Sequence, residues 1–493
     1  MRIKYTHKDI NNCYEKMISS AWHCLESHDI EKSLKFIDVA ANLQYHYNSI
    51  YKDDRLNDLL RVISESILNN CSIKCDEHCV LFYDFASLDN RGLTQQYIHA
   101  LLQNPRRKLL YVTEKDLSLP SSSDIKSMLD AGNVSIYELV GDNYSKNVHD
   151  FYSIVINNKP SCIFMHIAPW SVVPLTTLYA IKGIRIYNIN ITDHAFWLGN
   201  DLLTKSIEFR TYGIKLSLTE REISKNQICF LPFYPWVRRT VFKGFPTNVE
   251  NKIIIFSGGS IYKITDETDT FFHMVRYILI NNPQTVFFYA GTGNTDRIVK
   301  LIYKYQLSNR FFLLGDRTDI AEVFDNCHIY LGTYPVSGEL MSQYAAFFKK
   351  PIIALLKKGH DVIVGKNEMV ISYNNINELY KEIHLLINDS NYRDIKGRCL
   401  KDSLISQAEF SCIVNDICEG NDQGLPYYLT NESEDYRKYK EECLERLNLD
   451  VTKGALERRI AKVFGIKLLF VSLKITANSI VSILMTRRVS CKK

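Results

Sequence analysis

The sequence predicts an α/β protein in which an N-terminal helical appendage precedes two facing domains, each built on a parallel sheet. Short apolar runs rich in β-branched and aromatic residues alternate with helical stretches, and this alternation occurs twice along the chain. A segment with three prolines, 230–246, separates the two series. With 493 residues the chain is also too long for one hydrophobic core. We therefore expect two Rossmann-like domains joined by a proline-bearing hinge.

The first element is the helical appendage, which we place at 1–75. Residues 7–70 contain neither proline nor glycine, and their apolar residues recur at the helical period. Leu34, Ile37, Ala41 and Tyr45 form one such series. Three series follow one another, which predicts three helices.

The first sheet domain is expected at 76–245. Its apolar runs lack polar alternation, as is typical of parallel strands buried on both faces. The predicted strands are 80–85, 109–113, 134–140, 162–167, 184–191 and 214–218.

Cys71, Cys75 and Cys79 recur every four residues just before this domain, with His78 beside the last. A metal site is one interpretation, but no fourth ligand follows at a tight spacing. Small buried thiols on one helix face, running into a strand, are the interpretation that we favour.

The second sheet domain is expected at 246–420, and charged helices are expected at 421–493. The second series of apolar runs predicts strands at 252–256, 285–290, 311–314, 329–331, 351–355 and 369–372. Because open parallel sheets bind ligands beyond the carboxyl ends of their strands, the cleft between the two domains is the expected site.

Composition limits the partners and the compartment. Lys and Arg number 60 against 55 Asp and Glu, and this balance gives no reason to expect a nucleic-acid partner. The 13 cysteines show no disulfide framework, and the first twelve residues are too polar for a signal peptide. We therefore expect a cytoplasmic protein. Since no run of 18 uncharged apolar residues occurs, we expect no ordinary membrane span.

Glycines follow several predicted strands of the second domain. Glycines after a strand let the backbone approach an anion, and a following lysine adds a point charge. A tight turn alone would explain any single one of these pieces, but together they predict a phosphate site. The pieces are Gly258 and Gly259 with Lys263, Gly291 and Gly293, Gly315 to Arg317, and Thr333 with Ser337, Gly338 and Glu339.

This series of motifs resembles the donor-binding domain of GT-B glycosyltransferases over about residues 250 to 400. The resemblance implies that Lys263 and the helix start at Ser337-Gly338 hold the diphosphate of a nucleotide-sugar donor. It also implies that Arg317 meets the base and that Glu339 meets a ribose or sugar hydroxyl. Helix amides and cationic side chains then replace a metal, so no metal and no cofactor is expected.

Two further observations bear on this resemblance. Asp84-Phe85-Ala86-Ser87, with Asn90 to Leu93, resembles the glycine-containing loop after the first strand of the acceptor domain. The two glutamates eight residues apart that retaining members carry are absent, because Phe347 follows Glu339 at that spacing and Leu331 precedes it. The stereochemical outcome is therefore left open.

Catalytic candidates follow the strands of the first domain. Strand 184–191 runs into Asp193 and His194, and strand 162–167 carries His166. Histidine can take a proton from an acceptor hydroxyl near neutral pH, and Asp193 can orient the imidazole or act itself as the base. A histidine that only bonds to backbone is the alternative. Glu208 and Arg210 are interpreted as an ion pair rather than as part of the site.

The sequence therefore predicts transfer of a sugar from a nucleotide-sugar donor to an acceptor hydroxyl. Two alternatives stay open: a GT-B-like sugar-nucleotide epimerase, and a catalytically silent scaffold that binds nucleotide sugars.

The tail suggests the acceptor. Residues 463–485 are mostly apolar, Lys467, Lys474, Asn478 and Ser482 share one helical stripe, and basic residues flank the segment. A helix lying in an anionic membrane surface and a helix packed back on the protein both fit this pattern. The membrane interpretation predicts peripheral attachment to the inner face of the membrane and a lipid-linked glycan acceptor, as in surface polysaccharide assembly.

Overall fold

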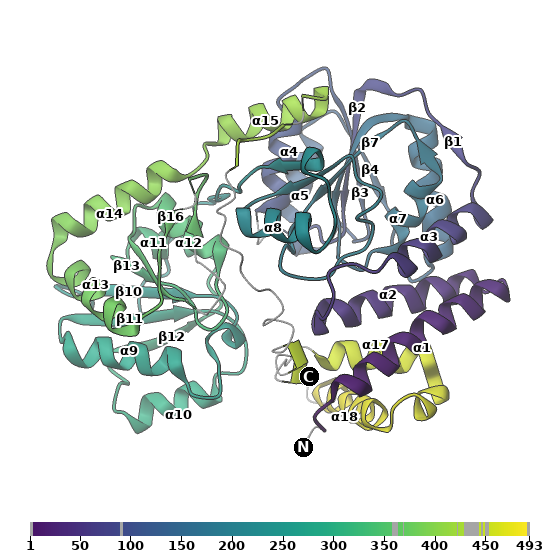
Figure 1. Ribbon diagram of the computed structural model, residues 1–493. Helices are drawn as coiled ribbons and strands as arrows, with labels where there is room; N and C mark the ends of the chain where they lie inside the picture. Colours follow the sequence, from purple (N-terminus) through teal and green to yellow (C-terminus); the bar gives the residue numbers. More distant parts are fainter. Residues whose placement is uncertain are drawn as a thin grey trace. The chain divides into compact units, whose positions relative to one another are not determined.

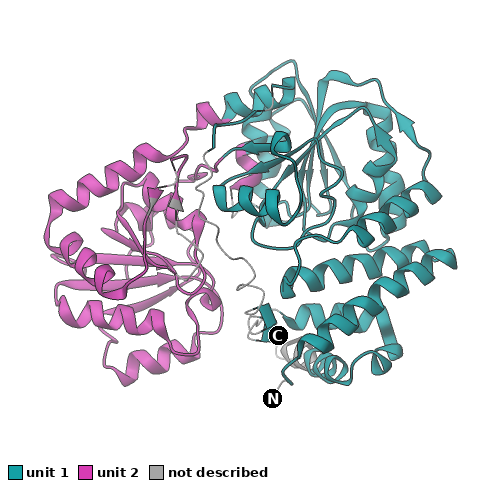
Figure 2. Ribbon diagram, viewed as in Figure 1, with its two compact units in different colours: residues 1–90, 97–231, 411–493 teal, residues 91–96, 232–410 magenta. Residues whose placement is uncertain are grey.

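A computed structural model shows two compact units, which are coloured separately in Figure 2. It describes residues 3–88, 92–356, 363–367, 369–421, 423–427, 443–444, 447–448 and 453–490. The first unit comprises 1–90, 97–231 and 411–493, and the second comprises 91–96 and 232–410. The division into four segments predicted from the sequence stays a prediction. Each unit contains a parallel sheet flanked by helices (Figure 1), as predicted.

Three helices begin the first unit: α1 (His7–Glu26), α2 (Ile30–Tyr47) and α3 (Asp54–Ile67). Each begins at a side chain that caps its first amides, Thr6 for α1, Asp29 for α2 and Asp53 for α3. Their apolar faces join the core of the first sheet through residues such as Leu34 and Ile63. These helices are therefore part of the first unit's core.

The sheet of the first unit has the strand order β4-β3-β2-β5-β7-β8-β9 in the described residues, and every neighbouring pair is parallel. Its side chains alternate between two helical layers: Tyr83 packs edge-on against Phe151 of α6, whereas Phe82 contacts Tyr97 of α4. The strands are β2 (Asp76–Asp84), β3 (Lys108–Thr113), β4 (Val134–Glu138), β5 (Pro160–His166), β7 (Arg185–Ile189), β8 (Lys205–Glu208) and β9 (Ile228–Phe230).

Helices connect these strands, and a short parallel pair lies beside the sheet. The helices are α4 (Leu93–Leu102), η2 (Pro120–Ser122), α5 (Ser123–Asp130), α6 (Tyr144–Asn158), α7 (Val172–Tyr179), α8 (Thr211–Thr219) and η3 (Lys225–Gln227); the pair is β1 (Cys71–Ser72) with β6 (Ile181–Lys182).

The strand predicted at 214–218 is wrong, because these residues lie in α8. The apolar run is the buried side of a helix whose Gly213 lies close to Asp193 and Glu208. The sheet continues instead from β7 through β8, whose Ser206 and Glu208 are polar but buried, to β9 at its edge.

The cysteine interpretation also needs correction. Cys71 lies in β1 and Cys79 in β2, so the three thiols do not share a helix face. In the part of the chain that the structure describes, no group of three or more His, Cys, Asp or Glu side chains is placed to hold a metal ion.

The sheet of the second unit has the order β12-β11-β10-β13-β14-β17 in the described residues and is also parallel throughout. Phe256 and Ile255 of its central strand face opposite layers of the core. The strands are β10 (Ile253–Gly258), β11 (Thr285–Ala290), β12 (Phe311–Gly315), β13 (Ile329–Leu331), β14 (Ile352–Leu355) and β17 (Ser372–Tyr373), with a separate hairpin of β15 (Ile363–Val364) and β16 (Met369–Val370).

Helices cover both faces of this second sheet. They are η4 (Ile261–Ile264), α9 (Thr270–Asn281), α10 (Asp296–Lys304), α11 (Ile320–Asp325), α12 (Glu339–Phe347), α13 (Ile376–Asn388), α14 (Ser390–Ser403) and α15 (Gln407–Glu419), the last of which continues into the first unit.

The C-terminal helices α17 (Lys453–Phe464), η5 (Gly465–Phe470) and α18 (Leu473–Ser490) pack against α1 and α2 (Figure 1). Phe464 meets Phe36 of α2 edge-on, and Lys474 forms an ion pair with Asp9 of α1. Within the described residues, no helix combines the length and the apolar character needed to cross a bilayer.

Candidate functional site

Strand order places the candidate ligand sites. In both sheets the order reverses once, between β2 and β5 in the first unit and between β10 and β13 in the second. In an open parallel sheet, the loops that leave the strands at such a switch point diverge and open a crevice. Asp84 and His166 end the first pair of strands, and Gly258 and Leu331 end the second.

In the second unit, the loops after β10 and β11 touch through their glycines. The Gly259 amide donates to the carbonyl of Ala290 at 2.9 Å, and the Ile261 amide donates to the carbonyl of Thr292 at 2.9 Å. Gly259 has a φ of 147°, a conformation that side chains other than glycine rarely adopt. The glycines after the two strands therefore let two backbones meet at van der Waals distance.

Lys263 joins the first of these loops to the loop after β13. Its Nζ donates to the carbonyl of Ser337 at 3.1 Å, and its own carbonyl accepts from the amide of Val336 at 3.3 Å. Thr333 Oγ1 donates to the carbonyl of Val336 at 2.6 Å, which closes the loop on itself. The ammonium of Lys263 is thus held beside the start of α12.

Gly338 is the residue that precedes α12, and it leaves a small space. A Cβ built there lies 3.5 Å from Thr333 Oγ1 and 3.9 Å from the carbonyl oxygen of Gly258. The first amides of a helix have no acceptor within the helix, and its dipole favours an anion at that end. Gly258, Thr333, Gly338 and Lys263 therefore surround a position suited to a phosphate.

Glu339 is the first residue of α12 and is half-buried. Ser337 Oγ donates to Glu339 Oε1 at 3.0 Å. A carboxylate held in this way can accept hydrogen bonds from sugar or ribose hydroxyls, whereas its charge disfavours direct contact with phosphate.

Two predicted donor-site residues have other contacts. Gly293 packs against Ile261, since a Cβ there would lie 2.8 Å from Ile261 Cβ. Arg317 is nearly buried and donates to both oxygens of Asp319 at 2.6 Å and to the carbonyl of Gly244 at 2.9 Å. Burial alone would raise the pKa of Asp319, but the hydrogen bonds from Arg317 and from the Lys243 amide hold it below its usual value. Asp319 precedes α11 without capping it through its side chain. The contact of Arg317 with a base stays a prediction.

In the first unit, the switch point holds a buried pair. His166 Nδ1 lies 3.0 Å from Asp84 Oδ1, and Tyr111 donates its hydroxyl to Asp84 Oδ2 at 2.7 Å. The His166 side chain is only 6% exposed and that of Asp84 is fully buried. This histidine therefore belongs to the buried core at the switch point. In the loop that follows β2, Asn90 and Arg91 lie outside the described residues.

Asp193 and His194 follow β7, which is next to β5. Asp193 accepts from both Arg210 Nε, at 2.5 Å, and Arg210 Nη2, at 2.9 Å, and its Oδ1 lies 3.4 Å from His194 Nδ1. Although burial opposes ionisation, the charge of Arg210 and the hydrogen bonds hold the pKa of Asp193 well below its usual range. Asp193 is therefore a permanent anion, a weak base that is better suited to orienting His194. Arg210 pairs with Asp193, and the predicted ion pair between Glu208 and Arg210 stays a prediction.

The loop that carries His194 is fixed from two sides. Asn48, the left-handed residue that ends α2, donates to the carbonyl of His194 at 2.8 Å and accepts from the amide of Phe196 at 3.0 Å. The fully buried Arg221 donates to the carbonyls of Asp193 and Ala195 at 2.7 and 2.6 Å. The imidazole itself is 43% exposed, so it can reach a substrate while its backbone is held.

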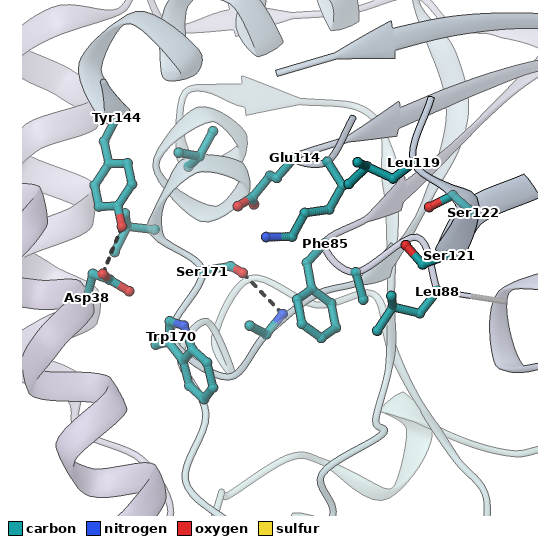
Figure 3. Close-up of a pocket in the computed structure, with 15 residues that line it drawn as sticks. Asp38, Phe85, Leu88, Glu114, Leu119, Ser121, Ser122, Tyr144, Trp170 and Ser171 are labelled. Carbon is teal, nitrogen blue, oxygen red and sulfur yellow. Dashed lines mark hydrogen bonds between the residues drawn. The ribbon is translucent and has the colours of Figure 1, made fainter. Parts of the chain in front are cut away.

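A cavity of about 340 Å³ opens in the first unit beside the same switch point (Figure 3). Phe85, Glu114 and Ala168, which follow β2, β3 and β5, line it together with Asp38 of α2 and Trp170. Tyr144 donates its hydroxyl to Asp38 Oδ2 at 2.9 Å, and Tyr83 donates to Glu114 Oε1 at 2.9 Å. Burial raises the pKa of both carboxyl groups. Carboxyl groups and hydroxyls beside an indole ring form a lining suited to a polyhydroxylated ligand.

The sequence analysis did not single out this cavity. Glu114 directly follows the predicted strand 109–113, and Trp170 lies three residues after strand 162–167. Both positions therefore carried the signal of a strand end. No signal in the sequence marked Asp38, because its partners Tyr144 and Arg459 are 106 and 421 residues away.

Comparisons with known proteins place the fold. No protein-family profile and no curated protein sequence matches the chain. Among solved structures, the Thermobaculum terrenum O-GlcNAc transferase is similar with a TM-score of 0.50 and 12% identity, over 89% of this chain and 83% of that chain. Anabaena HepE in complex with UDP and glucose has a TM-score of 0.50 and 13% identity, over 70% of this chain and 100% of that one. A protein assigned as a UDP-N-acetylglucosamine 2-epimerase from Listeria monocytogenes has a TM-score of 0.52 and 11% identity, over 72% of this chain and 100% of that one.

These likenesses confirm the predicted GT-B fold with two Rossmann-like units. Glycosyltransferases and an epimerase share this fold, so the fold does not decide between these reactions. The choice rests on the residues of the two sites.

Proposed function

We propose that the protein transfers a glycosyl group from a nucleotide-sugar donor to an acceptor hydroxyl. The observation that carries this proposal is the set of backbone and side-chain groups around the start of α12. Gly338 lets the start of α12 lie close to Thr333 and Gly258, and Lys263 supplies positive charge beside it at the switch point of the second sheet. Such a position suits the diphosphate of the donor.

The donor contributes the bond that breaks. The anomeric carbon leaves the distal phosphate oxygen of the donor, and negative charge develops on the departing nucleoside diphosphate. Lys263 and the first amides of α12 stabilise that charge without a metal or a cofactor. Glu339 accepts hydrogen bonds from a ribose or sugar diol, and Arg317 meets the base. HepE is in complex with UDP, and the Listeria protein is assigned as an epimerase of a UDP-sugar, so UDP-sugars are the first donors to test.

The acceptor contributes the bond that forms. Its hydroxyl oxygen bonds to the anomeric carbon, and His194 takes the hydroxyl proton in a transfer that inverts the anomeric centre. The half-exposed imidazole is accessible, and Asp193 Oδ1, which lies 3.4 Å from its Nδ1, can orient it. His166 is buried with Asp84, so it is assigned to the core at the switch point. The cavity beside Trp170 is assigned to the acceptor.

The acceptor is proposed to be a lipid-linked glycan, used in surface polysaccharide assembly by a cytoplasmic enzyme bound peripherally to the membrane. Support comes from the basic, apolar C-terminal segment and from Arg459, which joins that segment to Asp38 in the wall of the cavity.

The test begins with thermal shifts over nucleoside diphosphates and nucleotide sugars, since a ligand that binds the folded state raises the melting temperature. The protein is then incubated with a donor, which is the sugar derivative of the nucleotide that raises the melting temperature, and with octyl glycosides as acceptors. Release of the nucleoside diphosphate is followed. We expect release that depends on the acceptor. Exchange of the hydrogen at C2 of the sugar with solvent, in the absence of any acceptor, would instead identify an epimerase. Binding of the nucleotide sugar without turnover would identify a scaffold.

A further inference from the structure

The last helix, α18, buries mostly polar side chains and exposes apolar ones, whereas α17 buries apolar side chains such as Leu456, Ile460 and Phe464. Among residues 473–484 of α18, the buried ones are Ile475, Asn478, Ser479 and Ser482. Three of these four are polar, the reverse of an ordinary surface helix.

Hydrogen bonds explain the inward polar side. Asn478 donates to the carbonyl of Ile3 at 2.8 Å and accepts from its amide at 2.9 Å. Ser482 donates to the buried carboxyl group of Glu457, which also accepts from Tyr5 at 2.6 Å. These bonds fix the orientation of α18 on α1 and α17, so the exposure of its other side is built into the packing.

The turn between α17 and α18 and the exposed side of α18 carry seven exposed large apolar side chains, which we call the C-terminal apolar face. Phe470 is 89% exposed, Ile466 80% and Leu473 73%, and all three lie at the turn between α17 and α18. Leu469, Ile480, Ile483 and Leu484 continue the face, with Leu473, Ile480 and Leu484 on one helical stripe. Large side chains grouped and exposed in this way mark an interaction surface.

Charge identifies the partner. Residues 453–490 contain eight Lys or Arg and a single acidic residue, the buried Glu457, so this segment carries a formal charge of +7 whereas the whole chain carries only +5. Lys467 is exposed between Ile466 and Leu468 at the turn, and Lys462 is 77% exposed one turn earlier. Apolar side chains surrounded by cations match a bilayer whose headgroups are anionic.

We propose that the C-terminal apolar face inserts into the interface of an anionic lipid bilayer, with Phe470, Ile466 and Leu473 entering first. The inference gives the proposed membrane attachment its surface and does not depend on glycosyl transfer, because it rests on the packing of α17 and α18. Lys462 and Lys467 then lie at the level of the headgroups.

The test compares three proteins by co-sedimentation with vesicles of phosphatidylglycerol and phosphatidylcholine at low salt. They are the wild type, the triple variant Ile466→Ser, Phe470→Ser, Leu473→Ser, and a matched control, Val241→Ser, Ile280→Ser, Tyr303→Ser, whose side chains are 87%, 55% and 70% exposed in the second unit. We expect the triple variant to lose at least about tenfold in vesicle affinity and the control to bind as the wild type does. Binding should weaken in high salt and on vesicles of phosphatidylcholine alone.

A second measurement keeps the result independent of folding. Phe470→Trp places an indole at the turn, and its emission should shift to shorter wavelength when anionic vesicles are added, beyond any shift of the wild type. Equal binding by the triple variant, no pelleting of the wild type at low salt, or an unshifted indole would each overturn the proposal. A dimer in sedimentation velocity that the triple variant abolishes would also overturn it, because a second copy would then be the occupant. None of these outcomes would contradict the proposed glycosyl transfer, because transfer to a water-soluble acceptor is measured without lipid.

Discussion

Gly291 lies against the backbone of Gly259, such that a Cβ at Gly291 would stand 1.7 Å from the carbonyl oxygen of Gly259. The loops after β10 and β11 can meet in this way only because Gly291 lacks a side chain. We therefore expect Gly291→Ala to force the loops apart, to cost roughly 2 kcal/mol or more in the free energy of unfolding, and to abolish nucleotide binding.

Urea unfolding and a nucleotide titration check this expectation. Gly338→Ala is the control for stability, because its Cβ meets nothing closer than 3.5 Å. A Gly291→Ala protein as stable as wild type, with full nucleotide affinity, would show that the two loops do not form the cradle.

His194→Ala should reduce turnover by a factor of about 10² to 10⁴ and leave nucleotide affinity unchanged. The reason is that His194 accepts the proton of the acceptor, whereas the donor binds to the other unit. His78→Ala, which removes an exposed histidine of the same unit, serves as the control. If kcat of the His194 variant equals that of the wild type, the base lies elsewhere.

Trp170→Ala should raise KM for the acceptor about tenfold and leave KM for the donor unchanged, since the indole lines the cavity of the first unit. Steady-state kinetics with each substrate varied in turn separates the two constants. Trp22→Ala on α1, which also removes a partly buried indole, serves as the matched control. A rise in the donor constant alone would place the acceptor outside this cavity.

His328 should make the second unit less stable in mild acid. Its Nδ1 accepts from the Ile254 amide at 3.0 Å, and burial, with Arg393 and Lys350, lowers its pKa to about 4. Its unfolded pKa is about 6.5, so between these values the unfolded chain binds more protons and stability falls as the pH falls.

Because this ring is half-buried, solvent screening reduces the expected loss to about 2 kcal/mol between pH 7 and pH 4. The amide oxygen of His328→Asn can accept the same hydrogen bond. In urea unfolding, this variant should lose less of its unfolding free energy between pH 7 and pH 4 than the wild type, by that amount. An identical pH profile for the variant and the wild type would contradict the assignment.

The sequence predicted the sheets well where strands are apolar runs between glycines. The strand predicted at 285–290 coincides with β11, and the strand at 329–331 coincides with β13, because burial on both faces leaves mainly apolar and aromatic residues in both. The sequence did not predict β8, because its polar residues are typical of a loop. Ser206 and Glu208 are buried there, and the Glu208 carboxylate accepts hydrogen bonds from Ser206 and Ser217.

The candidate donor site could be found locally because each of its pieces follows its own strand. The first unit's site could be found only in part. Asp193 and His194 are adjacent in sequence, but the residues that hold them are distant: Asn48 ends α2, and Arg210 and Arg221 flank α8. Periodicity and turn signals describe single elements, so they cannot predict such tertiary partners.

The central claim is that a nucleoside diphosphate binds at the start of α12. Calorimetric titration of UDP into wild type and into Gly338→Val tests it most directly, because the valine side chain would occupy the space bounded by Gly258 and Thr333. We predict saturable binding by the wild type and a loss of at least about tenfold, or 1.4 kcal/mol, in the variant, with the melting temperature without ligand little changed. Undiminished affinity in a folded Gly338→Val protein would contradict the account.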